Sequence, residues 1–160
     1  MDIKIRKTVK EDRKAIRAIL VRTEVFNQEE IDCALELIDI YLNNPSQKDY
    51  SIASAINGNN EIVGYVCYGK TPLTYGAYNL YWIAVEPEYQ REGVGRILLN
   101  YVESEITKLL ARMLLAETSS RAVYEKTRQF YINNSFSEEA RIKDFYSKGD
   151  DKIIYRKDML

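Results

Sequence analysis

The sequence predicts one domain of mixed α/β class, and three observations carry this prediction. Apolar residues recur with helical spacing in some segments; in the segments between, they alternate with polar residues or form short continuous runs. The length of 160 residues is near the usual size of a single domain. The chain contains no repeat, linker or low-complexity segment. We therefore expect residues 1–160 to form one domain, with an antiparallel front half and a strand-helix-strand unit in the second half.

The first predicted elements are a short strand and two helices. Ile3 and Ile5 alternate with polar residues and predict the strand. A capping box, in which a Thr or Asn is followed three positions later by a Glu, marks each helix start. These pairs are Thr8 with Glu11 and Asn27 with Glu30. Apolar residues with helical spacing follow both pairs, and the second helix is expected to stop before Pro45.

Strands and helices then alternate to the end of the chain. The segments 50–56 and 61–69 are rich in strand-forming residues and flank an Asn-Gly pair, which is typical of a hairpin turn. Further strands are expected at 77–85, 112–118, 136–142 and 151–157, and further helices at 94–106 and 122–134. The segment 112–118 is almost wholly apolar, as expected for a strand that is covered on both faces.

The charge balance and the hydropathy exclude several classes of partner. The chain has 23 Lys and Arg residues against 24 Asp and Glu residues, which gives a net charge of −1. Because a general nucleic-acid binder needs excess positive charge, we expect no nucleic-acid partner. No apolar run reaches the roughly 18 residues that span a bilayer, and the N-terminal segment lacks the apolar region of a secretory signal. We therefore expect no membrane partner and a cytoplasmic location; the oligomeric state is left open, a homodimer included.

The sequence contains no histidine. This excludes catalytic triads built on histidine, histidine general bases and the usual zinc sites. We therefore expect no metal. Any catalysis must use carboxylates, tyrosines, serines, lysines or backbone dipoles.

The most informative stretch is EYQREGVGRILLNYVE, residues 88–103, in which Gly93 and Gly95 stand between a predicted strand and a predicted helix. A dinucleotide-binding fingerprint would need a third glycine where Leu98 stands, and a Walker loop would need Gly-Lys-Ser/Thr. Two interpretations remain. Either the glycines relieve crowding at the junction, or they let a phosphate approach the N–H groups at the helix start, beside two flanking arginines.

The same stretch resembles a motif of the GNAT superfamily of acyl-CoA-dependent N-acetyltransferases. The segment Gln90-Arg91-Glu92-Gly93-Val94-Gly95 matches the family's Q/R-x-x-G-x-G/A; it follows the apolar strand LYWIAVEPEY and precedes R-x-L-L. The segment from Tyr131 to Phe136 resembles the family's Y-x-x-x-G-F, with Ser135 in place of the glycine. The order of elements is similar over nearly the whole chain. The resemblance implies the GNAT fold: a mostly antiparallel, splayed sheet of about seven strands, flanked by about four helices.

The resemblance implies that acetyl-CoA is the co-substrate. Its pyrophosphate would bind the backbone N–H groups of Gln90, Arg91, Glu92, Gly93, Val94, Gly95 and Arg96. Its thioester would lie beside the strand end formed by Ile83, Ala84 and Val85. A backbone N–H near Val85 would then stabilise the oxyanion of a tetrahedral intermediate as an amine attacks the thioester directly.

The resemblance also assigns the proton transfers. Tyr131 would donate a proton or hydrogen bond to the departing thiolate; alternatively, it is a core aromatic residue of an amphipathic helix. Glu117, near a strand end, would deprotonate the amine, as in the ribosomal-protein alanine N-acetyltransferases that the chain most resembles. Alternatively, Glu117 forms a salt bridge with Arg121 or Lys126. Glu24, between the first two helices, is a second candidate for the base.

Residues that the resemblance implies at the acceptor site are Glu24, Tyr81 and Tyr146. Asp150 and Asp151 have two interpretations, because they are suited either to attract a cationic amine or to form a turn. Glu86 and Glu88, beside a proline, are expected to face solvent.

These features predict an N-acetyltransferase that moves the acetyl group of acetyl-CoA to a primary amine. The acceptor is either a peptide or protein α-amine or a small-molecule amine. A non-catalytic acyl-CoA sensor on the same fold would keep the glycine loop but would not need Tyr131 or Glu117. A purely structural domain would need neither the loop nor these two residues.

Overall fold

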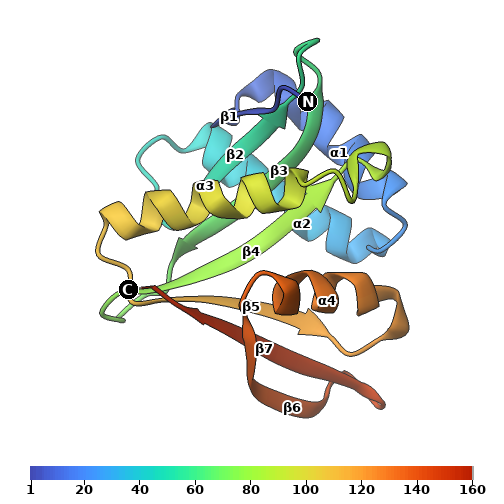
Figure 1. Cartoon of the computed structure of the whole chain (residues 1–160), viewed down its shortest axis with the longest axis vertical. Helices are drawn as coiled ribbons and strands as arrows, with labels where there is room; N and C mark the ends of the chain where they lie inside the picture. The colour runs from blue at the N-terminus through green and yellow to red at the C-terminus, as the bar shows by residue number, and fades with distance from the viewer. Residues whose placement is uncertain (160) are drawn as a thin grey trace. The chain divides into compact units, whose positions relative to one another are not determined.

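The computed structural model describes residues 1–159, which form seven strands in one sheet and four α-helices (Figure 1). The strands are β1 Lys4–Lys7, β2 Ser51–Ile56, β3 Ile62–Lys70, β4 Ala77–Val85, β5 Met113–Ser119, β6 Ser137–Ser147 and β7 Asp150–Asp158. The helices are α1 Arg13–Arg22, α2 Gln28–Asn43, α3 Val94–Lys108 and α4 Glu125–Asn133. Neighbouring strands are hydrogen-bonded in the order β1-β2-β3-β4-β5-β7-β6. This arrangement confirms the predicted mixed α/β fold class.

The chain divides into two compact units. The first contains residues 1–69 and 81–105, and the second contains residues 70–80 and the chain from Ile106 onward. Strand β4 contributes to both units. Among the helices of residues 1–159, none combines the length and the apolar character that a bilayer crossing requires.

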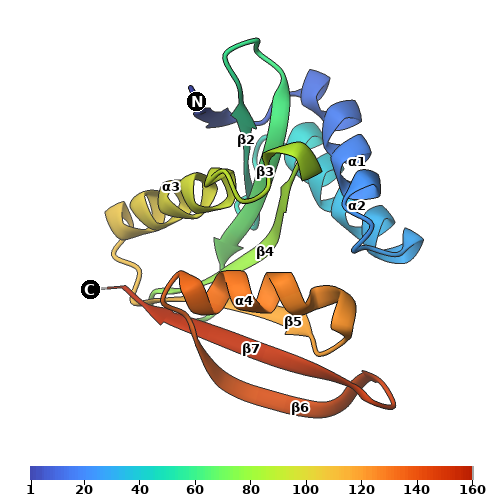
Figure 2. The ribbon, with the colours of Figure 1, turned by 45° about the vertical axis from the view of Figure 1, so that its right-hand side comes forward.

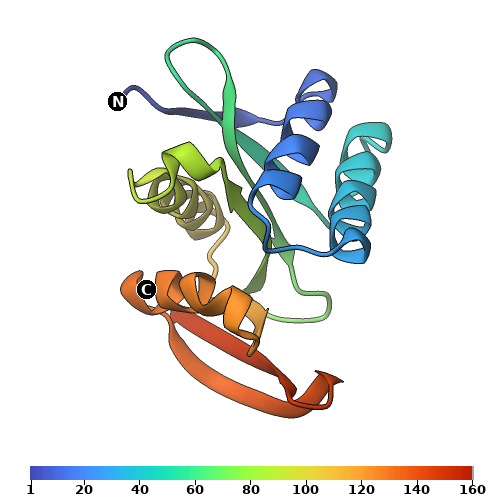
Figure 3. The same cartoon turned by 90° about the vertical axis from the view of Figure 1, so that its right-hand side faces the viewer.

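In the first unit, helices lie on both faces of the strands β2, β3 and β4 (Figure 3). The α1–α2 face holds a core of apolar side chains: Ile16, Ile19, Leu20, Ile31, Ala34, Leu35, Ile38, Ile52, Tyr65, Cys67 and Ala84. On the other face, α3 buries Val94, Leu98, Leu99, Val102 and Ile106. Burial of a large apolar side chain contributes roughly 1.5 to 3 kcal/mol, so these two layers hold the strands that lead to the glycine loop.

The start of α1 differs from the prediction. Thr8 does not cap the helix; its hydroxyl lies 2.7 Å from the hydroxyl of Ser54 on β2. The N-cap residue of the 3₁₀ turn Lys10–Asp12, which leads into α1, is instead Val9, whose N–H donates to the carboxylate of Asp12 at 3.0 Å. Asp12 is fixed at this helix start because its carboxylate also accepts hydrogen bonds from Arg6 and Ser54. Sequence spacing does not reveal these contacts.

The start of α2 is as predicted. The side chain of Asn27 accepts from the N–H of Glu30 at 2.8 Å, and the carboxylate of Glu30 accepts from the N–H of Asn27 at 3.3 Å. Such a cap stabilises a helix by about 1 kcal/mol. The helix ends at Asn43, before Pro45, because a proline would remove a helical hydrogen bond.

In the second unit, one helix packs on a short sheet, and α4 lies along β5 and β7 (Figure 2). Residues Ala77–Leu80 of β4 pair in parallel with Met113–Ala116 of β5. Strand β7 pairs antiparallel with both β5 and β6. The predicted strands 136–142 and 151–157 are present and extend further, so that the hairpin turn contains only Lys148 and Gly149.

Candidate functional site

The loop before α3 has the backbone of an anion site. Arg91 and Gly93 have left-handed φ values of +68° and +86°, and α3 begins at Val94. The first hydrogen bond of the helix runs from the N–H of Ile97 to the carbonyl of Gly93, at 3.0 Å. The N–H groups of residues 94–96 therefore have no partner within the helix, and they lie at the positive end of its dipole.

Position 93 favours glycine because its φ is left-handed, and not because neighbouring atoms leave no room for a side chain. A Cβ atom built on Gly93 would meet no atom within 4 Å, so the space beside its Cα is open. The crowded glycine of this region is Gly64 on β3, where a Cβ would lie 3.0 Å from the carbonyl oxygen of Ala84 and 3.1 Å from Leu98. Gly64 thus lets α3 approach the sheet. Sequence reasoning missed it, although a glycine inside a strand often signals such a close approach.

The strand end that leads into the loop is fixed by hydrogen bonds. The side-chain amide of Gln90 donates to the carbonyl of Val85 at 3.1 Å. The N–H of Glu86 donates to the carbonyl of Val63 on β3 at 2.9 Å. Because successive N–H groups of a strand point to opposite edges, the N–H of Val85 points away from β3.

Glu86 does not simply face solvent, as the sequence had suggested. Its side chain is only 14% exposed, and its carboxylate forms a bidentate pair with Arg22 at the end of α1. The position beside Pro87 predicted exposure, but the helix end that supplies Arg22 comes from a segment distant in sequence. Glu88 is exposed, as expected.

The two predicted acceptor residues of the first unit are both exposed. Glu24, directly after α1, has a left-handed φ of +57°. Tyr81 on β4 packs edge-on against Tyr50, with ring centroids 5.5 Å apart. A second aromatic pair, Phe26 and Trp82, has centroids 5.3 Å apart. Tyr81 and Trp82 are neighbours on β4, so both pairs involve this strand.

Tyr131 lies in the second unit, on α4, and is 5% exposed. Its ring packs against Phe136 and Tyr155, with centroids at 5.3 and 5.6 Å. Burial, together with the neighbouring phenol of Tyr155, raises the pKa of Tyr131, so the hydroxyl keeps its proton at neutral pH. The residue is therefore a core aromatic residue that also holds a donor hydroxyl.

The helix that carries Tyr131 ends on Ser135, which stands where the family motif has glycine. Ser135 adopts a left-handed φ of +71°, the conformation that glycine adopts at little cost. The N–H of Phe136 donates to the carbonyl of Tyr131 at 3.0 Å, which closes the helix end. The turn geometry is thus kept in spite of the substitution.

Glu117, on β5, forms an ion pair that the sequence did not predict. Its carboxylate lies 2.9 Å from the ammonium of Lys152 on β7, and its side chain is 47% exposed. Neither of the partners expected from sequence is the one found: Arg121 pairs with Asp150, at 3.4 Å. The antiparallel pairing of β5 with β7 brings Lys152 close, and sequence distance hides this neighbour.

The β6–β7 turn is held by its aspartates. Asp150 is 7% exposed and accepts a hydrogen bond from the hydroxyl of Ser119. Asp151 accepts from the guanidinium of Arg141 at 3.1 Å and from the N–H of Asp144 at 3.0 Å. Both carboxylates are therefore engaged in contacts within the protein, and the two residues lie at the start of β7, directly after the Lys148–Gly149 turn.

Tyr146, the third predicted acceptor residue, lies on the exposed strand β6. Its side chain is 49% exposed and packs at a right angle on Phe145, with ring centroids 5.0 Å apart. The candidates thus divide between the units. The first holds Glu24, Tyr81, Ile83, Ala84, Val85 and residues 90–96, and the second holds Glu117, Tyr131 and Tyr146.

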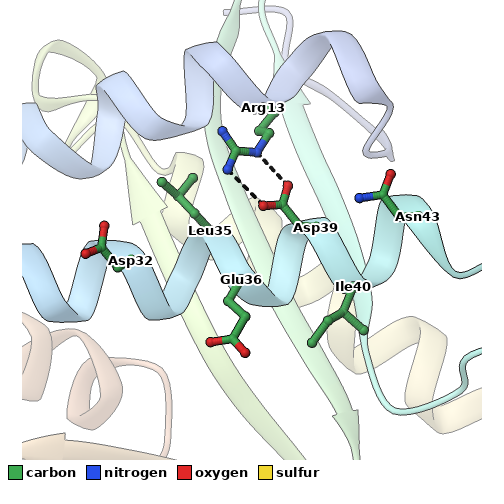
Figure 4. A pocket seen from close by; sticks show the side chains of 7 residues that line it. All are labelled: Arg13, Asp32, Leu35, Glu36, Asp39, Ile40 and Asn43. Atoms are coloured by element: carbon green, nitrogen blue, oxygen red, sulfur yellow. Dashed lines mark hydrogen bonds and ion pairs between the residues drawn. The ribbon is translucent and has the colours of Figure 1, made fainter.

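A surface hollow of about 500 Å³ lies between α1 and α2 (Figure 4). Its lining residues are Arg13, Asp32, Leu35, Glu36, Asp39, Ile40 and Asn43. Arg13 and Asp39 join the two helices by a bidentate ion pair, with 2.6 Å between Nε and Oδ1. None of the predicted site residues lines this hollow.

Comparison with known proteins identifies the family. The model of the acetyltransferase (GNAT) family matches residues 13–130. A candidate GNAT acetyltransferase from Desulfovibrio desulfuricans is 41% identical, with a TM-score of 0.92, and the match covers 99% of this chain and 100% of that one. No match was found among curated proteins.

Two solved structures of lower identity share the fold. The ribosomal-protein-S18-alanine N-acetyltransferase of Escherichia coli is 20% identical, with a TM-score of 0.74 over 99% of this chain and 94% of that one. The PaiA N-acetyltransferase of Thermoplasma acidophilum, in complex with coenzyme A, has the same identity of 20% and TM-score of 0.74, over 99% of each chain. The family match and the 41% identity decide the assignment. The chain therefore belongs to the GNAT family of acetyltransferases and is an acyltransferase that acts on amines.

Proposed function

We propose that this protein transfers the acetyl group of acetyl-CoA directly to a primary amine, and that residues 1–160 act as one acetyltransferase domain. The observation that carries the proposal is the loop at the start of α3. There, two left-handed residues, Arg91 and Gly93, precede a helix start whose N–H groups have no partner within the helix, and the space beside Gly93 is open. A pyrophosphate suits this arrangement, because it is anionic and accepts several hydrogen bonds.

The loop binds acetyl-CoA through the backbone of residues 90–96. The glycines at 93 and 95 admit the pyrophosphate oxygens, and the guanidinium groups of Arg91 and Arg96 add positive charge. Gln90 serves the loop indirectly, since its amide holds the carbonyl of Val85. The coenzyme A bound by a GNAT relative of the same fold supports this choice of donor.

Val85 stabilises the oxyanion of the tetrahedral intermediate through its backbone N–H, and Ile83 and Ala84 flank the thioester. The direction of the Val85 N–H, away from β3, supports this role because it leaves the group pointing out of the β3–β4 pairing. One oxyanion donor of this kind is typically worth about 3 to 4 kcal/mol of transition-state stabilisation.

Two side chains move the protons. The acceptor amine arrives mainly as an ammonium, since such amines titrate near 8 to 10.4, and Glu117 accepts its proton. Tyr131 protonates the departing thiolate, or donates a hydrogen bond to it. Tyr131 is protonated at neutral pH, and the raised pKa that follows from its burial favours hydrogen-bond donation to the thiolate over complete proton transfer.

The acceptor is a peptide or protein α-amine or a small-molecule amine, and Glu24, Tyr81 and Tyr146 are the candidate residues for binding it. The exposure of all three side chains supports their availability. The ribosomal-protein-S18-alanine N-acetyltransferase, which shares the fold, supports testing peptide amines first.

Two measurements test the proposal. Acetyl-CoA at about 100 times its Kd should stabilise the folded state by roughly 2.7 kcal/mol, which a thermal-shift assay detects. Thiol release should then appear with some member of a panel of peptide N-termini and small amines. An absent thermal shift would overturn the donor assignment. A thermal shift without thiol release for any amine would show that the protein binds acetyl-CoA without transferring its acetyl group, and would overturn the proposed reaction.

A further inference from the structure

The ion pair between Glu117 and Lys152 places an amine on the proposed catalytic base. The Nζ atom of Lys152 lies 2.9 Å from Oε2 of Glu117. The two residues lie on neighbouring antiparallel strands, where Lys152 is opposite Ser119 and thus diagonal to Glu117. A general base must come within about 2.6 to 3.2 Å of the amine that it deprotonates, and the ammonium of Lys152 meets this condition.

Lys152 is held more firmly than a surface lysine. Its side chain is only 16% exposed, and its ammonium lies 4.6 Å from the centroid of the Phe145 ring. A cation over an aromatic face is attracted by the ring, so Phe145 and Glu117 fix the amine from two directions. By contrast, Lys148, in the turn of the same hairpin, is exposed.

We propose that Lys152 is a self-acetylation site, at which the protein's own lysine takes the place of the acceptor amine. The inference rests on the proposed function, because it needs acetyl-CoA as donor and Glu117 as base. Its observation is separate, since the position of Lys152 was not used in assigning either. A lysine ε-amine is a primary amine, which is the acceptor class of the proposed reaction.

Protons and bonds are conserved in this step. The ammonium of Lys152 gives one proton to the carboxylate of Glu117, and the neutral Nζ attacks the thioester carbon of acetyl-CoA. The C–N bond forms, the tetrahedral intermediate collapses and the C–S bond breaks. The second proton of the amine leaves with the thiolate, through Tyr131. The products are acetyl-Lys152, the free thiol of coenzyme A and a proton that Glu117 returns to water.

Acetylation would change the surroundings of Glu117. An acetylated lysine has no charge, so it can keep neither the ion pair with Glu117 nor the cation contact with Phe145. The carboxylate then lacks its cationic neighbour and is available to an external ammonium. Self-acetylation would therefore convert a base that is occupied by its own chain into one that accepts a substrate.

The test uses the full chain, incubated with acetyl-CoA and no other amine. Intact-mass and peptide-mass measurements follow acetyl groups at Lys152 and Lys148. We expect Lys152 to react at least about ten times faster than Lys148, because its amine is held beside a base. The first-order rate constant should not change with protein concentration, since the reaction occurs within one chain. Glu117→Gln should slow acetylation of Lys152 and leave the background at Lys148 unchanged.

Two lysine variants distinguish the two sites. Lys148→Arg should leave the modification at Lys152 intact, whereas Lys152→Arg should remove it. If the protein acetylates an external amine while Lys152 reacts no faster than Lys148, the self-acetylation proposal is wrong and the proposed function stands. If acetyl-CoA neither binds nor reacts with any amine, both proposals fail. A rate constant that rises with protein concentration would show transfer between chains and also overturn the proposal.

Discussion

Arg22 at the end of α1 forms a bidentate ion pair with Glu86, the first residue after β4, with 2.8 Å between Nε and Oε1 and 2.5 Å between Nη2 and Oε2. Glu86 precedes the 3₁₀ turn Pro87–Tyr89, which leads into the loop of residues 90–96. The contact therefore ties the helix α1 to the entry of the proposed pyrophosphate loop.

Loss of this contact should weaken acetyl-CoA binding modestly. Arg22→Ala removes the partner of Glu86, and we expect the Kd for acetyl-CoA to rise by a factor of at most about five, because an ion pair with one solvent-exposed partner is weak. Isothermal titration calorimetry measures the change. Arg17→Ala, an exposed arginine on the same helix, is the matched control and should leave the Kd unchanged. A Kd that rises equally in both variants would assign the effect to net charge instead.

Gly93→Ala should strain the loop without a steric clash. The left-handed φ of +86° costs a residue with a Cβ roughly 1 to 2 kcal/mol, whereas the added methyl meets nothing within 4 Å. We expect lower thermal stability and weaker acetyl-CoA binding. Gly58→Ala is the control, because its added methyl also meets nothing within 4 Å and its φ lies outside the left-handed region. Equal stability of the two variants would contradict the conformational argument.

Tyr131→Phe should separate catalysis from folding. The variant keeps the ring that packs on Phe136 and Tyr155 and loses only the hydroxyl. We expect thiol release to fall by about 10² or more, with acetyl-CoA binding retained. Tyr155→Phe removes a hydroxyl from the same aromatic cluster and should cost far less. Unchanged turnover in Tyr131→Phe would leave the residue only its role in the core.

Ser135→Gly should stabilise the protein. Ser135 holds a left-handed φ of +71°, which glycine adopts without a Cβ penalty, so we expect a gain of up to about 1 kcal/mol and a higher Tm. Urea denaturation measures the gain. Ser137→Gly, at the first residue of the exposed strand β6, should instead lower stability, because glycine loses more backbone freedom on folding. A loss of stability in Ser135→Gly would mean that the serine side chain makes a compensating contact.

The ion pair of Arg6 with Asp12 should give stability a defined pH dependence. Burial opposes ionisation of Asp12, but hydrogen bonds from Arg6, Val9 and Ser54 prevail and lower its pKa. Since the pKa is lower in the folded state, ionised Asp12 stabilises the fold above the ordinary aspartate pKa of about 3.9. This contribution is lost as the pH falls through the folded-state pKa.

Arg6→Met therefore should destabilise the fold by about 1 to 3 kcal/mol at pH 7, since Asp12 is 4% exposed and loses its partner. The difference from the unmodified protein should shrink as the pH falls below the ordinary aspartate pKa of about 3.9 and through the lower folded-state pKa of Asp12; Tm measured against pH checks this. Arg13→Met breaks the half-exposed pair with Asp39 and serves as the control, with a smaller effect. A difference that is independent of pH would assign the effect to packing.

The sequence by itself determined the order of elements and the position of the glycine loop before α3. Helix spacing, the cap at Asn27 and the alternating strands are local signals, and the structure confirms them because each depends on residues within a few positions. The motif from Gln90 to Gly95 identified the family for the same reason, since a glycine turn before a helix is a local device.

Only the tertiary structure decided the contacts between distant segments. It joined Glu86 to Arg22, Glu117 to Lys152 and Asp12 to Ser54, and it replaced the expected cap at Thr8. Each of these three carboxylates contacts its partner because strands pair or because a helix or turn packs against the sheet. These contacts depend on which residues are close in three dimensions. The spacing of residues along the chain does not show this.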